Sequence, residues 1–456
     1  MTKVLKLPIF LNKTGTLKTQ KITRIFILLI ILILKTTFAQ ELIKNNSDLN
    51  LHFQQTVVTQ GYPSFQAKYS GVNSLDTTGE TATSLTTTLF LGLRLYKNLE
   101  LYVNPEISGG TGISGAVGLA GFSNGETFRI GNPKPALYPA RLFLKYTLNL
   151  DNQNMDSLGD DANQLREMQS KQNFTVIIGK FGIADYFDNN DYSHDPRKQF
   201  LNWALMNSGA WDYPADTRGY TWGFALMYND PSYAIQFAAV MEPLKANGLV
   251  MDPHINKAFG LALEFDKYYS ILDEDGTARL LLYQNKARMG SYREVLDNPA
   301  YNMDITLTER YSRSKYGFAF NISQKINENS GCFLRASWND GKTETWAFTE
   351  IDQSVATGIE DKGIIKARIN DEFGVAYVIN GLSNDHREYL AAGGYGFMIG
   401  DGKLNYGYEN IFETYYKIQF TSYLMLTLDY QFVLNPAYNK DRGPVNILAI
   451  RAHIEL

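Results

Sequence analysis

Cysteine and histidine are scarce in this chain of 456 residues, which contains one cysteine and five histidines. The single cysteine, Cys332, excludes an intramolecular disulfide and a cysteine-based zinc site. The histidines are scattered without the H-E-x-x-H spacing of a metallohydrolase. The sequence therefore predicts no catalytic residues, no cofactor and no enzymatic activity.

Long apolar runs are also absent beyond residue 34. The apolar segment 25–34 is shorter than the about 18 residues that a membrane-spanning helix needs. Five lysines and Arg24 precede it, and small residues follow it at positions 37 and 39 in Thr37-Phe38-Ala39. A basic region, a short apolar region and small residues at a cleavage site are typical of a secretory signal peptide. We therefore expect residues 1–39 to be a signal peptide and residues 40–456 to form the exported protein.

The overall composition favours a β-barrel over a helical membrane protein. Aromatic residues make up 13% of the chain, yet its mean hydropathy is only -0.24. In an outer-membrane barrel half of each strand faces water, which lowers the mean hydropathy. The net charge of -4 gives no basic surface for nucleic acid.

Apolar and polar residues alternate in several segments. In residues 445–456, Ile450 lies on an apolar face and Arg451 on a charged one, because successive side chains of a strand point to opposite faces. Residues 85–95 and 99–106 alternate in the same way on either side of a short turn. This pattern predicts a hairpin tall enough to cross a membrane.

We predict an all-β fold, namely a transmembrane, antiparallel outer-membrane β-barrel of about sixteen strands in one domain. The expected strands begin near residues 51, 84, 98, 137, 173, 219, 232, 256, 277, 315, 331, 370, 390, 403, 422 and 445. An even number closes an antiparallel barrel with both termini on one side, and a barrel of this size is wide enough for an aqueous channel. The polar stretches 151–171 and 343–367 are predicted to be loops.

A glycine-rich segment follows the second strand of the predicted hairpin. Residues 110–115 have the G-x-G-x-x-G spacing of dinucleotide-binding loops. They lie between amphipathic strands rather than after a buried parallel strand, which argues against a nucleotide site. We expect residues 109–125 to fold inward instead and to narrow the pore.

The acidic stretch 185–191 contains Asp185, Asp188 and Asp191. Closely spaced carboxylates suit Ca²⁺, but the glycine and the terminal glutamate of an EF-hand are missing. The alternative is an extracellular or pore-mouth loop whose carboxylates accept hydrogen bonds from its own backbone. The sequence favours the loop and leaves a structural cation open.

A dense block of aromatic and polar residues spans positions 200–223. Aromatic faces pack against the C–H face of a sugar, while amides and charged groups bind its hydroxyls. The alternative is that the tryptophans belong to the aromatic belt at the membrane interface. We favour the belt for Trp222 and leave both interpretations open for Trp203 and Trp211. The candidate solute-contacting residues in this block are Trp203, Trp211, Asp216 and Arg218.

Several short motifs follow one another in a distinctive order along most of the mature chain. They are His52-Phe53-Gln54, residues 69–75, Asn104-Pro105-Glu106, residues 121–126, residues 139–142, Gly179-Lys180-Phe181, residues 185–190, residues 200–223, Glu413-Thr414-Tyr415-Tyr416, Asp429-Tyr430-Gln431, Asn435-Pro436 and Arg451. In this order they resemble the OprB-type carbohydrate-selective porins. Residues 270–370 match least, and Leu456 stands where the family usually has phenylalanine.

The resemblance implies a sixteen-stranded barrel with passive, sugar-preferring diffusion through a constriction of arginine and glutamate. On this sequence Glu106 and Arg141 are the candidates, and Arg129 is a further one. Strand parity independently places Glu106 and Arg141 toward the lumen, opposite leucine-bearing faces. An arginine facing lipid would cost about 2–4 kcal/mol at the bilayer midplane. We expect Glu106 and Arg141 to face each other across or along the narrowest part of the pore.

The sequence thus predicts an outer-membrane porin of a Gram-negative bacterium that lets small sugars diffuse passively. The alternatives are a general small-solute porin and, less favoured, a barrel enzyme or an adhesin. The expected partners are small sugars, outer-membrane lipids with lipopolysaccharide, and the barrel-assembly machinery, but not nucleic acid. A monomer and a homotrimer both fit the sequence.

Overall fold

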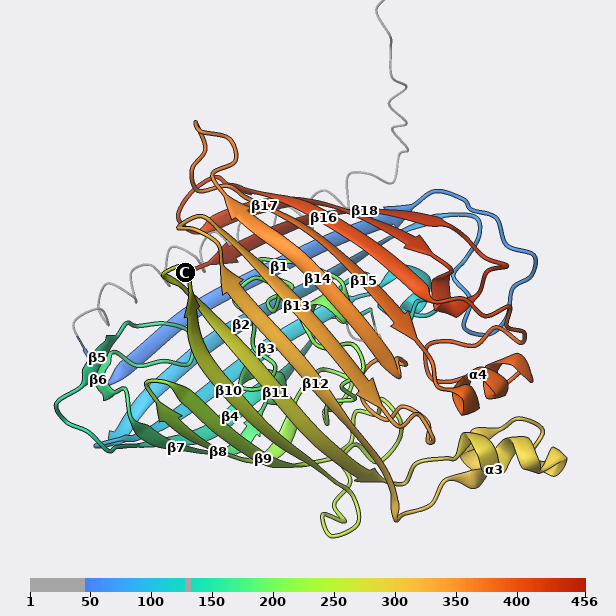
Figure 1. The fold of residues 1–456 in the computed structure, drawn as a ribbon, viewed down its shortest axis with the longest axis horizontal. Helices are drawn as coiled ribbons and strands as arrows, with labels where there is room; N and C mark the ends of the chain where they lie inside the picture. The colour runs from blue at the N-terminus through green and yellow to red at the C-terminus, as the bar shows by residue number, and fades with distance from the viewer. Residues whose placement is uncertain (1–45, 128–132) are drawn as a thin grey trace, which may run out of the picture.

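The main feature of the computed structural model, which describes residues 46–127 and 133–456, is a closed antiparallel β-barrel (Figure 1). Most neighbouring strands are also neighbours along the chain. The ring closes where the first strand pairs with the last one, for example with Val57 opposite Ala452. A closed barrel leaves no unpaired strand edge. The prediction of a sixteen-stranded, all-β barrel is confirmed.

The barrel strands are β1 (Leu49–Tyr62), β2 (Glu80–Tyr96), β3 (Leu99–Gly110), β4 (Ala136–Asn149), β7 (Asn173–Phe181), β8 (Thr221–Asp230), β9 (Tyr233–Met241), β10 (Phe259–Ile271), β11 (Glu274–Ala287), β12 (Arg313–Lys325), β13 (Ser330–Asn339), β14 (Gln353–Lys362), β15 (Glu372–Gly381), β16 (Glu409–Gln419), β17 (Leu424–Leu434) and β18 (Val445–Glu455). A separate hairpin consists of β5 (Met155–Leu158) and β6 (Glu167–Ser170). The α-helices are α2 (Trp203–Met206), α3 (Tyr292–Asp297) and α4 (Asn384–Ala391). Short 3-10 turns lie at Ile113–Gly115, Ile183–Asp185, Pro299–Tyr301, Ile305–Thr308 and Pro436–Tyr438. None of the helices in the described ranges is long and apolar enough to span a membrane.

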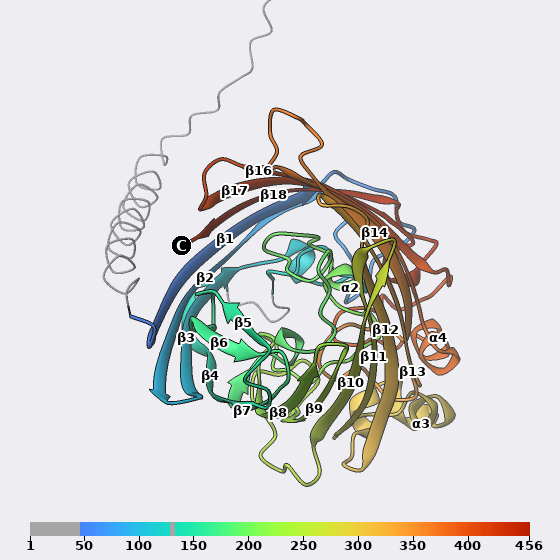
Figure 2. The ribbon, with the colours of Figure 1, turned by 60° about the vertical axis from the view of Figure 1, so that its left-hand side comes forward.

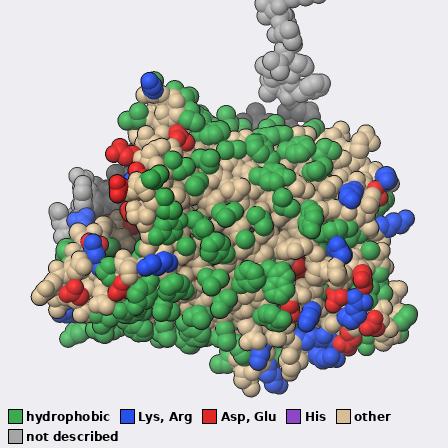
Figure 3. Space-filling view, viewed as in Figure 1, with side chains coloured by type: hydrophobic (Ala, Val, Ile, Leu, Met, Phe, Trp, Pro, Cys, Tyr) green, Lys and Arg blue, Asp and Glu red, His purple; other side chains and the backbone are tan. Residues whose placement is uncertain are grey.

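The outer wall of the barrel is apolar because alternate side chains point outward. On β18, the outward-pointing Leu448 and Ile450 are 62% and 52% exposed, whereas the next residue, Arg451, points inward and is fully buried. Figure 3 shows hydrophobic side chains spread over the middle of the outer face, with many charged groups toward its ends. Such a band is what an outer-membrane barrel presents to lipid.

The two ends of the barrel have different connections. At the end where β1 begins and β18 finishes, most turns are short, such as 97–98, 231–232 and 272–273. We call this the turn end. The opposite end, the loop end, carries long connections such as 182–220 and 382–408. In outer-membrane barrels short turns face the periplasm and long loops face the outside.

Two strand predictions were wrong. One strand was missed and one was predicted where there is a helix, so the predicted number of strands is still sixteen. The predicted loop 343–367 contains β14, in which Thr357 interrupts the outward apolar series and weakens the alternation. The strand expected near residue 390 is instead α4, whose N-cap Ser383 accepts a hydrogen bond from the backbone N–H of His386 at 3.2 Å. The strand expected near 403 begins at Glu409, and the predicted loop 151–171 contains β5 and β6.

Three connections of the loop end fold into the lumen, so the barrel is not an open tube (Figure 2). They are residues 111–127, 182–220 and 340–352, which we call the first, second and third inward segments. Phe122, Trp211 and Trp346, one from each segment, are fully buried. The sequence predicted inward folding only for residues 109–125, and that prediction is confirmed.

Candidate functional site

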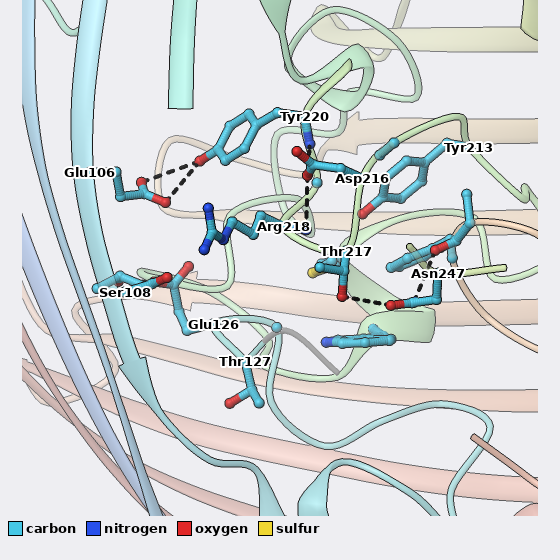
Figure 4. A pocket seen from close by; sticks show the side chains of 18 of the residues that line it. Glu106, Ser108, Glu126, Thr127, Tyr213, Asp216, Thr217, Arg218, Tyr220 and Asn247 are labelled. Atoms are coloured by element: carbon cyan, nitrogen blue, oxygen red, sulfur yellow. Dashed lines mark hydrogen bonds between the residues drawn. The ribbon is translucent and has the colours of Figure 1, made fainter. Parts of the chain in front are cut away.

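Two cavities occupy the space that the inward segments leave in the lumen. The first has a volume of about 660 Å³ and extends toward the loop end, where Asn247 and Phe348 line it (Figure 4). The second has a volume of about 1640 Å³ and extends toward the turn end, where Asp161 and Glu455 line it. The residues that line both cavities are Gly125, Glu126, Arg197, Met206, Tyr213, Arg218, Gly219 and Tyr220. We call these residues the aperture, because a solute that crosses both cavities passes between them.

At the aperture, Arg197 lies between two carboxylates. Its Nε atom is 2.9 Å from Glu126 Oε1, and its Nη2 atom is 3.5 Å from Glu106 Oε2. Glu106 also accepts hydrogen bonds from the hydroxyl groups of Tyr138 and Tyr220. Burial opposes the charge of Arg197, yet Glu126 and Glu106 hold its pKa well above the ordinary value. The aperture therefore carries a fixed positive charge between two acidic groups.

A second guanidinium at the aperture belongs to Arg218. Its central carbon lies 3.8 Å from the centre of the Tyr138 ring. Within residues 46–127 and 133–456 this side chain forms no ion pair, and its Nε has no hydrogen-bond partner. A cation over an aromatic face gains about 0.5–2 kcal/mol without using its N–H donors. Arg218 is therefore oriented by Tyr138, with its Nε buried, while the residue lines both cavities.

Asp216 shapes the turn that presents Arg218 and Tyr220. Its Oδ1 accepts hydrogen bonds from the backbone N–H groups of Arg218 at 2.9 Å and of Tyr220 at 3.2 Å. Burial raises the pKa of Asp216, and Lys180, 3.5 Å away, opposes that shift. Asp216 also lines the first cavity, so it both supports the aperture and forms part of the cavity wall.

Aromatic rings form a further wall of the first cavity. The ring centres of Tyr213 and Phe348 are 4.2 Å apart, and Trp203 stacks on Phe348 at 5.3 Å. The indole of Trp203 donates a hydrogen bond to the carbonyl of Asn124 at 2.9 Å. The sequence left open whether Trp203 contacts a sugar in the lumen or belongs to the aromatic belt at the membrane interface. The structure places its side chain inside the barrel.

The other tryptophans of the block occupy two different environments. Trp211 is fully buried beside Tyr213 and lines neither of the two cavities, so it packs within the wall of the lumen. The belt interpretation is therefore wrong for Trp203 and Trp211. Trp222, by contrast, lies on β8 and is 40% exposed on the outer face, as that interpretation predicts.

Glu106 and Arg141 both face the lumen, as strand parity predicts, but they come from the adjacent strands β3 and β4. Glu106 lines the first cavity and Arg141 the second, so they lie along one wall of the path rather than on opposite walls. Arg141 donates two hydrogen bonds to Asp185, at 2.7 and 2.5 Å, and its guanidinium lies 5.1 Å from the Tyr220 ring. Arg129 falls outside the described residues.

A bulge between β3 and β4 explains why parity did not identify Tyr138. The register shifts between Asn104 and Pro105, and Pro105 lies opposite Pro139. Proline has no N–H to donate to a strand ladder and is typical of bulges. Parity reverses beyond the bulge, so Tyr138 and Arg141 both face the lumen. The two opposing prolines are the sequence signal for this feature.

Buried carboxylates hold the inward segments in place. Glu409 on β16 accepts hydrogen bonds from backbone N–H groups of the first inward segment at 2.7 and 3.0 Å, and Glu413 does the same for the second at 2.5 and 3.1 Å. Asp212, within the second segment, accepts three from the third segment. A buried backbone N–H group without a partner is costly, so these hydrogen bonds favour the inward position of the segments. The cavities are therefore bounded by well-anchored walls.

The acidic stretch 185–191 lies inside the barrel against β12 and β13, so the extracellular position is wrong, whereas the expected backbone hydrogen bond is present at Asp185, which accepts one from the N–H of Gly182 at 3.0 Å. Asp188 accepts a hydrogen bond from Ser208 Oγ at 2.9 Å and lies 3.4 Å from Arg335 Nε. Asp191 accepts one from Ser323 Oγ at 2.8 Å. Asp185 accepts hydrogen bonds from Arg141, so each of the three carboxylates has a hydrogen-bond donor within the protein.

Comparison with known proteins assigns this architecture to a family. The model described as "Carbohydrate-selective porin, OprB family" matches residues 72–456. Porin AaxA of Chlamydia abortus is 23% identical over 297 residues, which are 64% of this chain and 57% of that protein, so the chain spans little more than half of this relative's length. The high-pH structure of Pseudomonas putida OprB has the same fold, with a TM-score of 0.67 and 15% identity over 90% of this chain and 95% of that chain. This chain belongs to the OprB family of carbohydrate-selective porins.

Proposed function

We propose that this protein is an outer-membrane porin of a Gram-negative bacterium through which small, uncharged sugars diffuse passively. The observation that carries the proposal is the aperture, where guanidinium groups, carboxylates and aromatic rings surround one path. Hydroxyl groups of a sugar both donate and accept hydrogen bonds, so they replace part of their hydration shell on such groups. The C–H faces of the sugar pack on the aromatic wall.

The charges around the aperture explain a preference for neutral solutes. Arg197 and Arg218 line the same cavity as Glu106 and Glu126. A charged solute that is attracted to one of these groups is therefore repelled by a group of its own sign close by. A neutral solute with donors and acceptors has no such repulsion. The proposal assigns no chemical step to the protein, and movement follows the concentration gradient.

The proposed path lies within one chain, since every aperture residue belongs to the same barrel. The proposal therefore holds for a monomer and for a homotrimer. The apolar outer face would contact membrane lipids and lipopolysaccharide, and insertion would use the barrel-assembly machinery that serves outer-membrane barrels.

We also propose that residues 1–39 are removed on export. The mature protein is then expected to begin at Gln40, because small residues precede that position at 37 and 39. N-terminal sequencing of the protein from purified outer membranes measures this directly. A protein that keeps residues 25–34 would contradict the assignment.

The sugar proposal is tested by solute entry into liposomes that contain the purified protein. A hexose should enter faster than an amino acid of similar size. Equal entry of both would support a general diffusion porin instead.

A further inference from the structure

The connection between β4 and β7 differs from the other connections at the turn end. It runs from residue 150 to residue 172 and carries the β5–β6 hairpin, whereas the turns at 97–98 and 231–232 have two residues. Figure 1 places β5 and β6 at this end of the barrel, and Figure 2, which turns the end toward the viewer, shows them across part of its opening. A connection that only had to join two neighbouring strands would not need this length.

The tip of this connection, residues 160–164, is bound to the inner wall. Asn50 on β1 donates hydrogen bonds from Nδ2 to Asp160 Oδ1 at 2.7 Å and to the carbonyls of Asp161 and Gln164 at 2.8 and 3.1 Å. Two strands away, Asn104 on β3 donates one to Asn163 Oδ1 at 2.9 Å. The tip is thus held at two points of the wall that β1, β2 and β3 form.

The residues that follow the tip, at the start of β6, are fixed as well. The backbone N–H of Leu165 donates to the hydroxyl of Tyr102 at 3.1 Å, and the Leu165 side chain is 1% exposed. Arg94 donates to Glu167 Oε2 at 2.9 Å. At the base, the backbone N–H of Ser170 donates to Asn149 Oδ1 at 3.0 Å, so both ends of the hairpin are bound to the barrel wall.

The tip reaches far into the barrel. Asn104 lies five positions from Leu99, the first residue of β3, which corresponds to about 17 Å along a strand at about 3.4 Å per residue. Asn104 is also paired with Arg141, which lines the second cavity. The tip therefore stands at the level of the solute path and not outside the mouth of the barrel.

Polar groups surround the tip within the second cavity. Residues 161–164 line this cavity together with Lys198 and Glu455, whose charged groups are 2.6 Å apart. Burial opposes the charge of Lys198, but Asp195, Glu455 and Asp161 hold its pKa above the ordinary value. A solute that has passed the aperture meets these groups next.

We propose that residues 160–164 form a second restriction, in series with the aperture, and set the size of the largest neutral solute that leaves at the turn end. The inference rests on the proposed pore function, but it concerns the bore of the channel and not its preference for sugars. Size exclusion and ion conductance therefore test it even if the sugar preference is absent.

Replacing residues 151–171 with Asn-Gly removes the hairpin. The ladder between β4 and β7 continues to Asn149 and Asn173, so a short turn can join the two strands. We expect the single-channel conductance to rise about twofold, because a restriction in series has been removed. A trisaccharide should also enter liposomes faster. A folded variant with wild-type conductance and the wild-type size limit would overturn the proposal.

A second variant adds bulk at the tip and keeps every hydrogen bond of the hairpin side chains. Ala162→Trp places a large ring in the second cavity, which Ala162 lines. We expect lower conductance and slower disaccharide entry. Asn329→Trp, in the exposed β12–β13 turn of the same end, is the matched control and should conduct like the wild type. Equal conductance of Ala162→Trp and Asn329→Trp would refute the second restriction even if the deletion variant does not fold.

Discussion

Arg218→Ala is expected to raise the single-channel conductance about twofold and to shift the ion preference toward cations. The side chain lies at the junction of the two cavities, so its loss widens the path and removes one positive charge there. Its contact with the Tyr138 ring is the single aromatic contact it makes within residues 46–127 and 133–456, so the fold should persist. Planar-bilayer recordings in salt gradients measure both quantities.

Two further variants make this expectation specific. Glu126→Gln keeps the size of the side chain but removes a negative charge beside Arg197, so it should shift the ion preference toward anions. Lys257→Ala also removes a positive charge that lies over an aromatic ring, because Lys257 Nζ is 5.4 Å from the centre of the Tyr311 ring. Lys257 lies outside the aperture. This control should conduct like the wild type. Equal shifts for Arg218→Ala and Lys257→Ala would show that the aperture does not set the ion preference.

Leu263→Arg is expected to destabilise the inserted barrel by about 2–4 kcal/mol, the cost of an arginine on the lipid face near the bilayer midplane. Leu263 is 45% exposed on the outer face and pairs with Phe237, the middle residue of β9. That energy corresponds to about a 30- to 1000-fold fall in the ratio of folded to unfolded protein. Urea titration of the protein in lipid vesicles measures it.

Gln236→Arg is the matched control at the same depth, since Gln236 pairs with Glu264, the residue after Leu263. Its side chain points into the lumen and donates to Glu264 and Asp266, each at 3.3 Å. An arginine there has two carboxylate partners, so we expect near wild-type stability. If both variants lose the same stability, the assignment of the two faces is wrong.

The sequence was sufficient for the barrel because strand parity is a local property. The alternation around Ile450 and Arg451 identified the lipid and lumen faces of β18 without any knowledge of the partner strands. Strand parity likewise placed Glu106 and Arg141 in the lumen. It failed for β14, since Val355, Thr357 and Ile359 form too weak an apolar series to distinguish a strand from a loop.

The aperture could be predicted only in part, because most of it lies on the inward segments. Arg197 reaches Glu126 across 71 positions of sequence, and no periodicity indicates which side chains of two irregular segments will meet. Arg218 was identified from its aromatic surroundings. Tyr138 was missed because the bulge at Pro105 and Pro139 reverses the parity on which the argument relied.

The most direct test of the account is the ratio of entry rates of a hexose and a zwitterionic amino acid of similar size into liposomes that contain the purified protein. The aperture pairs charges of both signs with aromatic faces, so the wild type should admit the hexose several times faster, about three- to tenfold. The ratio should fall toward one in Arg218→Ala. A wild-type ratio of one, in liposomes whose channels conduct ions normally, would contradict sugar selectivity.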